Sequence, residues 1–324
     1  MAMSFGARFV RDPSLLTSRR PLDPWGGQTL DIHFVGGPYR FTGMDEDGVA
    51  AIRDAYGTLC RPSVDGGSGA GAQTITQVLR TSKADFVPDG GAGGEYVMDL
   101  AFSPDAVDIA GPRFVARVAL EPSLSGVLAC AESDTALALL AFHNYFRVLV
   151  AYRLLRLGGI LLHSAGVVRA GAAYLVLGQS GAGKSTFARM SQNAGLQILS
   201  DDLNALLVQA DGPVVEKLPF AGSLDRTETD ATAYPLGLLG VVRKGPDDRI
   251  GPEALRTGDA VAAVVAAAPF VNLNPHALRR LMEVAEAVVR RCAVFPVTFN
   301  LGGRFWESTP VTSTAAFGDP HHAR

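Results

Sequence analysis

The chain has 324 residues, of which 48% are hydrophobic and 19% are charged, and its formal net charge is −3. This balance excludes a wholly disordered chain, because disorder requires low hydrophobicity combined with high net charge. It also argues against a general nucleic-acid binder, which needs a strongly basic surface. At about 100–200 residues per domain, the length predicts two domains.

The three cysteines, Cys60, Cys130 and Cys292, are far apart and show no C-x-x-C spacing. Isolated cysteines in odd number indicate neither a disulfide framework nor a zinc site, and they fit a reducing compartment. The first residues contain no apolar segment typical of a signal peptide, and no run of about 18 apolar residues could cross a bilayer. We therefore expect a cytoplasmic protein without a membrane partner.

Residues 1–133 are expected to form an N-terminal α+β domain, because short runs of β-forming residues alternate with Gly-rich loops. The predicted strands are 31–35, 39–42, 77–80, 96–101 and 114–120, and a short helix is predicted at 47–59. This half contains no catalytic motif. Recognition of an acceptor is its expected role, and simple support of the catalytic core is the alternative.

A long helical pattern, residues 134–157, is predicted to connect the two halves. Ser133 or Asp134 can cap its start, and Gly158 ends it. Apolar residues surround nearly its whole circumference, so we expect this helix to be buried between layers.

Residues 158–307 alternate between strand and helix patterns, which predicts an α/β domain, and residues 308–324 are expected to be a loose tail. The predicted strands are 160–168, 172–177, 196–199, 203–208, 214–218, 236–242 and 295–301. The predicted helices are 184–194, 258–268 and 276–292.

The segment 178–186 reads GQSGAGKST and matches G-x-x-x-x-G-K-[ST], with a predicted strand before it and a predicted helix after it. In such a loop the backbone amides and the helix N-terminus surround a phosphate group. Lys184 would reach the β- and γ-phosphates, and Ser185 would bind Mg²⁺. ATP and Mg²⁺ are therefore the expected cofactors. The expected nucleotide-binding residues are Gly178, Ser180, Gly181, Ala182, Gly183, Lys184, Ser185 and Thr186.

Two adjacent carboxylates, Asp201 and Asp202, follow the predicted strand 196–199. Neighbouring side chains of an extended backbone point in different directions, so one Asp can bind Mg²⁺ while the other accepts a proton from a hydroxyl. The alternative is that one of them only caps the following turn. His163 lies on an apolar strand, 15 residues before Gly178. A histidine of this kind is typical of a core, but its place beside the phosphate loop makes it a candidate site residue.

Three elements in this order resemble the catalytic domain of the HPr kinase/phosphorylase family: His163-Ser164-Ala165-Gly166, the loop GQSGAGKST, and Ser200-Asp201-Asp202. The resemblance covers about residues 158–302 and implies a P-loop core of the HPr kinase/phosphoenolpyruvate carboxykinase type. It implies a kinase that uses ATP and Mg²⁺ to phosphorylate a serine of a small protein. Asp201 would be the base, Asp202 would hold the metal, and His163 would lie near the transferring phosphate beside Lys184.

The family's later signatures are absent, and residues 218–228 occupy the place of one of them. Arg226 and Arg304 are candidates for the charge that stabilises the transition state. The N-terminal half also differs from that of HPr kinases. These departures favour a relative with another target, as in kinases that tailor ribosomally made peptides such as lasso peptides. A peptide or small protein is therefore the expected partner, and self-association into a homo-oligomer stays open.

Two other functions fit the same motifs. One is a small-molecule kinase that acts on a free amino acid or a sugar. The other is a slow ATPase with a regulatory role. A base at the end of the acidic strand favours a kinase, because a switch protein more often places a water-orienting group there.

Overall fold

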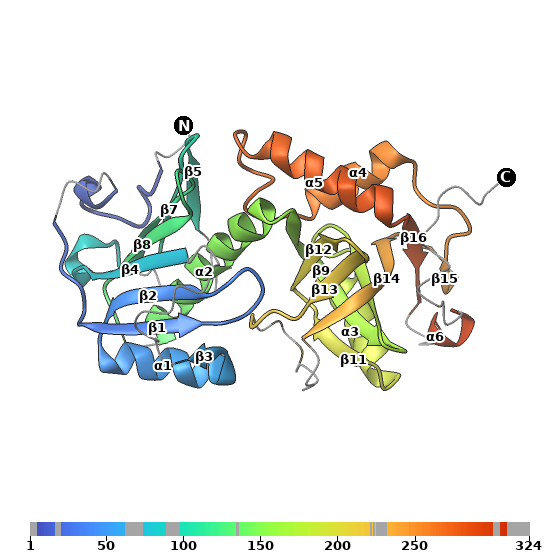
Figure 1. Cartoon of the computed structure of the whole chain (residues 1–324), viewed down its shortest axis with the longest axis horizontal. Helices are drawn as coiled ribbons and strands as arrows, with labels where there is room; N and C mark the ends of the chain where they lie inside the picture. The colour runs from blue at the N-terminus through green and yellow to red at the C-terminus, as the bar shows by residue number, and fades with distance from the viewer. Residues whose placement is uncertain are drawn as a thin grey trace. The chain divides into compact units, whose positions relative to one another are not determined.

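The computed structural model describes residues 5–16, 21–61, 74–88, 98–133, 136–220, 222, 224, 232–245, 247–300 and 305–309. This part of the chain is mixed α/β with two large sheets (Figure 1). The chain divides into two compact units, Met1–Val150 and Ala151–Arg324, and helix α2 (Ala136–Arg156) spans the division. Arg226, Arg304 and residues 310–324 of the predicted tail lie outside the described residues.

The sheet of the first unit has the strand order β3-β1-β2-β4-β8-β7-β6-β5. Strand β4 pairs in parallel with β2 and β8, and the other neighbours are antiparallel. The strands are β1 (Gln28–Ile32), β2 (Tyr39–Met44), β3 (Cys60–Arg61), β4 (Thr74–Arg80), β5 (Asp99–Phe102), β6 (Ala106–Gly111), β7 (Phe114–Ala119) and β8 (Ser125–Cys130). Short 3-10 turns cover Pro13–Leu15, Gly57–Leu59 and Lys83–Asp85.

An aromatic cluster packs α2 against this sheet. The ring of Phe41 on β2 lies 4.6 Å from that of Phe142 and 5.2 Å from that of Phe146, measured between centroids. The Tyr145 hydroxyl forms a 2.7 Å hydrogen bond with the hydroxyl of Thr76. A Cβ added at Gly126 would collide with the Tyr145 hydroxyl. Helix α1 (Glu46–Tyr56) also contributes a ring, because Tyr56 contacts Phe142.

The sheet of the second unit has the strand order β10-β9-β12-β13-β14-β16-β15. An additional parallel pairing between β10 and β14 closes β10, β9, β12, β13 and β14 into a ring, and β11 pairs with β9. The strands are β9 (Gly159–Arg169), β10 (Ala172–Leu177), β11 (Gln197–Ser200), β12 (Leu203–Gln209), β13 (Gly212–Glu216), β14 (Ala233–Val242), β15 (Arg249–Ile250) and β16 (Val294–Thr298). The parallel neighbours of β14 are β10 and β16.

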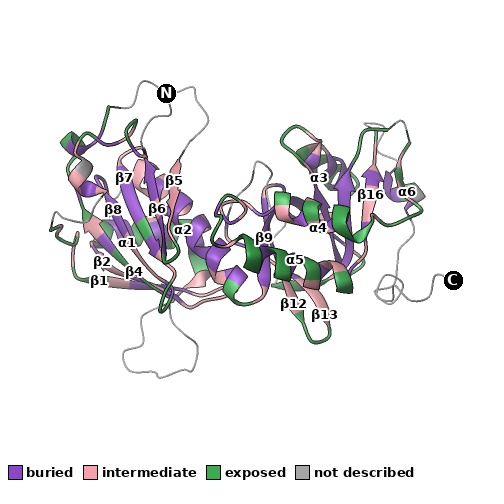
Figure 2. Cartoon of the chain, turned by 90° about the horizontal axis from the view of Figure 1, so that it is seen from above, coloured by how far each residue is buried: buried purple, intermediate pink, exposed green. Residues whose placement is uncertain are grey.

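The helices of the second unit are α3 (Lys184–Asn193), α4 (Thr257–Ala266), α5 (Leu278–Arg291) and α6 (Phe305–Ser308). Helix α5 is amphipathic, with an exposed outer face (Figure 2) and a buried face made of Leu281, Val284, Ala285 and Val288. In the core beneath α3, Phe187 packs against Trp306, whose indole N–H donates to Ser191 Oγ at 2.9 Å. No helix in the described ranges is both long and apolar enough to cross a bilayer.

Candidate functional site

The glycine loop lies between β10 and α3, which is the context that the motif predicts. Gly181 and Gly183 have φ values of +74° and +109°, and this left-handed region favours glycine over other residues. A Cβ added at Gly181 would meet no atom within 4 Å, so the loop presents open backbone. Gly183 is also the N-cap of α3, whose first-turn amides face the loop without helical partners. This arrangement suits an anion.

Lys184 is the first residue of α3, and it is only 6% exposed. Its ammonium donates to the carbonyl oxygens of Gly178 at 2.9 Å and Gln179 at 3.1 Å, so the side chain lies across its own loop. Burial lowers the pKa of Lys184, and the nearby carboxylate of Asp202 acts in the opposite direction. An ammonium has three donors, so one stays available for a phosphate oxygen.

His163 and Asp202 meet across neighbouring strands. His163 on β9 is paired with Leu203 on β12, and the Ser164 amide donates to the Asp202 carbonyl at 3.0 Å. The distance between His163 Nε2 and Asp202 Oδ1 is 3.7 Å, which is too long for a direct hydrogen bond. Burial and the charge of Lys184 lower the pKa of His163, whereas Asp202 raises it. Burial is the largest of these effects, so the neutral imidazole is favoured.

Asp201 has different surroundings from Asp202. It is 5% exposed, and its Oδ1 accepts a 3.3 Å hydrogen bond from the amide of Leu224. A Cβ added at Gly222 would collide with the same oxygen. The two carboxylates have different surroundings, and the one that acts electrostatically on Lys184 and His163 is Asp202. The assignment of the base to Asp201 stays a prediction, and the geometry favours Asp202.

Polar residues that the sequence analysis did not single out hold these strands together. The buried Asn204 on β12 donates to the carbonyl oxygen of Ser164 at 2.9 Å and to its hydroxyl at 3.0 Å. A Cβ added at Gly166 would collide with the amide oxygen of Asn204. The backbone amide of His163 donates to the Ala267 carbonyl after α4, at 2.7 Å. In the sequence, Gly166 was the signal that another group approaches this strand closely.

Two oxygen-bearing side chains near the loop are the candidate protein ligands of a Mg²⁺ ion. Ser185, in the first turn of α3, is exposed, and the side chain of Asp202 is about one-third exposed. Within the described ranges, no group of three His, Cys, Asp or Glu residues could hold a metal alone. Mg²⁺ is usually bound through one or two protein oxygens together with substrate phosphates, and both Ser185 and Asp202 carry oxygen atoms of this kind.

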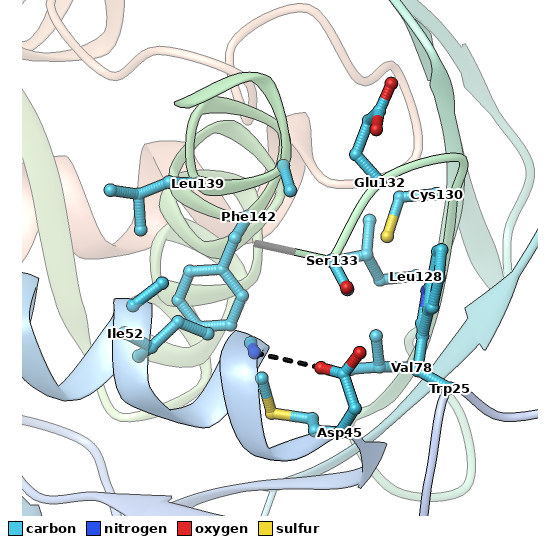
Figure 3. Close-up of a pocket in the computed structure, with 14 residues that line it drawn as sticks. Trp25, Asp45, Ile52, Val78, Leu128, Cys130, Glu132, Ser133, Leu139 and Phe142 are labelled. Carbon is cyan, nitrogen blue, oxygen red and sulfur yellow. Dashed lines mark hydrogen bonds between the residues drawn. The ribbon is translucent and has the colours of Figure 1, made fainter. Parts of the chain in front are cut away.

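A separate cavity lies in the first unit, between α1, α2 and the sheet (Figure 3). Phe142, Trp25 and Cys130 border it, and Asp45 at its edge accepts the 2.8 Å hydrogen bond from the Gly48 amide that caps α1. Its volume is about 30 Å³, which holds no more than two or three water molecules. A nucleotide does not fit in this cavity.

No family profile and no curated protein matches the chain. Among solved structures, the HPr(Ser) kinase/phosphatase from Coxiella burnetii is similar to it, with 12% identity over 45% of this chain and 89% of that chain. The TM-score is 0.27, which is too low to identify a shared fold. The likeness therefore adds nothing to what the residues at the glycine loop indicate.

Proposed function

We propose that this protein is an ATP- and Mg²⁺-dependent phosphotransferase that moves the γ-phosphoryl group to a serine hydroxyl of a peptide or small protein. One observation carries the proposal: His163 lies 3.7 Å from Asp202, and Lys184, the first residue of the helix after an open glycine loop, acts electrostatically on both. A phosphate-binding loop with a carboxylate next to its lysine is what phosphoryl transfer to a hydroxyl requires.

The proposed roles follow from the contacts. The loop amides and Lys184 bind the phosphates and neutralise their charge. Ser185 and phosphate oxygens would hold Mg²⁺, which neutralises further charge on the phosphates and leaves Asp202 available as a base. The acceptor oxygen forms a bond to the γ-phosphorus while the bond to the β–γ bridging oxygen breaks. Asp202 accepts the proton that the hydroxyl loses, and the imidazole of His163 lies 3.7 Å from this carboxylate.

The acceptor is proposed from the resemblance of three motifs to HPr kinases, and from an N-terminal unit that has no catalytic motif of its own. A small-molecule kinase would need only a closed pocket beside the loop. The three motifs and the separate N-terminal unit make the peptide or protein acceptor the leading proposal.

The test incubates the full chain with Mg²⁺, labelled ATP and the products of neighbouring genes, and measures mass gain by peptide. One phosphoryl group on a serine, absent with the Lys184→Ala variant, supports the proposal. Label on a free amino acid or sugar moves the assignment to a small-molecule kinase. Steady ATP consumption without transfer indicates an ATPase. A full chain that does not bind ATP rejects all three.

A further inference from the structure

Three parallel strands end at one edge of the second sheet. Strand β14 pairs in parallel with β10, with Leu177 opposite Val241, and in parallel with β16, with Val241 opposite Pro296. The glycine loop follows β10 at this edge. In α/β sheets, ligands bind just outside the carboxyl ends of parallel strands. The segment that follows β14 therefore lies in the region where a ligand of the loop would bind.

That segment is in contact with the loop. Val242 Cβ lies 3.6 Å from the place of a Cβ on Gly178, and Val242 Cγ1 lies 4.0 Å from that of a Cβ on Gly183. The next residue, Arg243, donates its amide to the Val297 carbonyl at 2.8 Å, which fixes the segment against β16. Arg243 and Lys244 thus come directly after a residue that touches both the first and the last glycine of the loop.

Both side chains are exposed, and neither forms an ion pair or a hydrogen bond with any residue in the described ranges. By contrast, the basic residues on α5 are paired: Arg279 and Arg280 both contact Glu283. Lys is rare in this chain, and of its four lysines two, Lys184 and Lys244, lie at this edge. Two unpaired cations beside a phosphate loop are placed to meet negative charge.

We propose that Arg243 and Lys244 form a second phosphate contact, which binds the polyphosphate of the nucleotide opposite Lys184. This inference rests on the proposed function. A triphosphate carries more negative charge than one lysine and one Mg²⁺ balance, and transfer spreads charge over the γ-phosphoryl oxygens. An arginine fork and a lysine ammonium are the usual donors for such oxygens. Arg243 and Lys244 would then supply the positive charge that stabilises the transition state, a role for which the sequence analysis named Arg226 and Arg304.

The test compares three full-length proteins: wild type, the double variant R243Q/K244Q and the double variant R279Q/R280Q. The last is a matched control, because it removes the same charge from an adjacent, exposed pair on α5. Affinities for Mg·ATP and for Mg·tripolyphosphate, a probe without a base, are measured by calorimetric titration. Unfolding of the nucleotide-free proteins is followed by circular dichroism.

We expect R243Q/K244Q to weaken binding of both probes by about tenfold or more, since hydrogen bonds to charged groups contribute that much. R279Q/R280Q should change it less than about twofold, and the charge-preserving R243K/K244R should restore most of the affinity. If R243Q/K244Q unfolds, the single variants R243Q and K244Q replace it. Equal affinity and equal turnover in R243Q/K244Q and R279Q/R280Q overturn the inference while the proposed function stands. A wild type that binds neither probe overturns both.

Discussion

The imidazole of His163 on β9 and the carboxylate of Asp202, which directly precedes β12, lie 3.7 Å apart between Nε2 and Oδ1. The two residues are neighbours because the antiparallel register places Leu203 opposite His163. Lys184, from the helix after the loop, acts electrostatically on both. Histidine, carboxylate and ammonium thus come from three separate elements. A neutral histidine beside a carboxylate is suited to guide a proton away from an attacking hydroxyl.

The substitution Lys184→Ala is expected to abolish phosphoryl transfer while the fold is kept. The ammonium donates to two carbonyl oxygens of its own loop, which is where the phosphates are expected to bind. Removing one preorganised charge of this kind typically costs about 10²-fold or more in rate. Transfer is measured with labelled ATP, and circular dichroism checks the fold. A rate within about tenfold of wild type would contradict a phosphate-loop mechanism.

Replacing Asp201 and Asp202 by asparagine, one at a time, should change turnover by different amounts. Asp202→Asn is expected to lower turnover by about 10²-fold or more, because it removes the carboxylate in electrostatic range of Lys184 and 3.7 Å from His163. Asp201→Asn should cost less than about tenfold, since an amide oxygen can still accept the hydrogen bond from Leu224. Turnover and Mg²⁺ titrations are compared at saturating ATP.

The opposite result is informative. If Asp201→Asn is the more damaging change, the role predicted from the family resemblance is right, and the contact of Asp201 with Leu224 belongs to a conformation that rearranges before transfer.

Much of the second unit was predictable from sequence because its signals are local. The apolar strand before the loop, the glycines and the helix start lie within one short stretch, and β10 and α3 begin where the pattern predicts. Strands β6 and β8 of the first unit were not predicted. Both contain Ala and Gly, which have low β-propensity, and their burial does not alternate. Their strand conformation comes from pairing with β7.

The site was predictable as a set of residues but not as a set of contacts. The motifs name His163, Lys184 and both aspartates, and the structure brings Asp202 rather than Asp201 to the lysine. Which of two adjacent residues faces the loop depends on the turn after β11, where Ser200 Oγ accepts hydrogen bonds from the amides of Asp202 and Leu203. No spacing rule expresses such a turn, and the role of Asn204 likewise depends on register.

Adding one methyl group at Gly166 should destabilise the second unit. The new Cβ would collide with the amide oxygen of the buried Asn204, whose hydrogen bonds to Ser164 hold the strand that carries His163. Overpacking of this kind costs about 1–3 kcal/mol. Gly258→Ala, where a Cβ meets open space on α4, is the control and should change stability by less than about 1 kcal/mol. Equal urea midpoints for both variants would contradict the packing assigned to Gly166.

Acid should weaken the first unit through His143. This residue on α2 is largely buried, and burial together with Arg147 lowers its pKa from 6.5 to about 4. The unfolded chain binds a proton at this histidine near pH 6.5 and the folded chain only near pH 4. The free energy of unfolding therefore falls as the pH decreases through this window. Uptake of one proton lowers the free energy of unfolding by at most about 1.4 kcal/mol per pH unit, and partial exposure of the ring reduces this effect.

The measurement compares wild type with His143→Gln, which cannot take up a proton, in urea titrations between pH 7 and pH 4. The variant should lose less stability than wild type over this range. His276→Gln, at an exposed position, serves as the reference variant. Identical slopes for wild type and His143→Gln would show that this histidine is not the source of acid sensitivity.

A fragment that begins at Asp134 is expected to aggregate, although it contains every proposed catalytic residue. Removing residues 1–133 strips the sheet from one face of α2, and Phe142, Tyr145 and Phe146 then lose partners such as Phe41 and Thr76. Each exposed aromatic side chain presents about 150–250 Å² of apolar surface. The same fragment with Phe142→Gln and Phe146→Gln should be more soluble and should still bind Mg·ATP. Size-exclusion chromatography measures solubility, and ATP titration measures nucleotide binding.

The soluble fragment then tests acceptor recognition. If it binds ATP normally but no longer binds or phosphorylates a macromolecular acceptor, the first unit is responsible for recognising that acceptor. If the fragment without these substitutions stays monomeric, the aromatic face of α2 does not cause aggregation when the sheet of the first unit is removed.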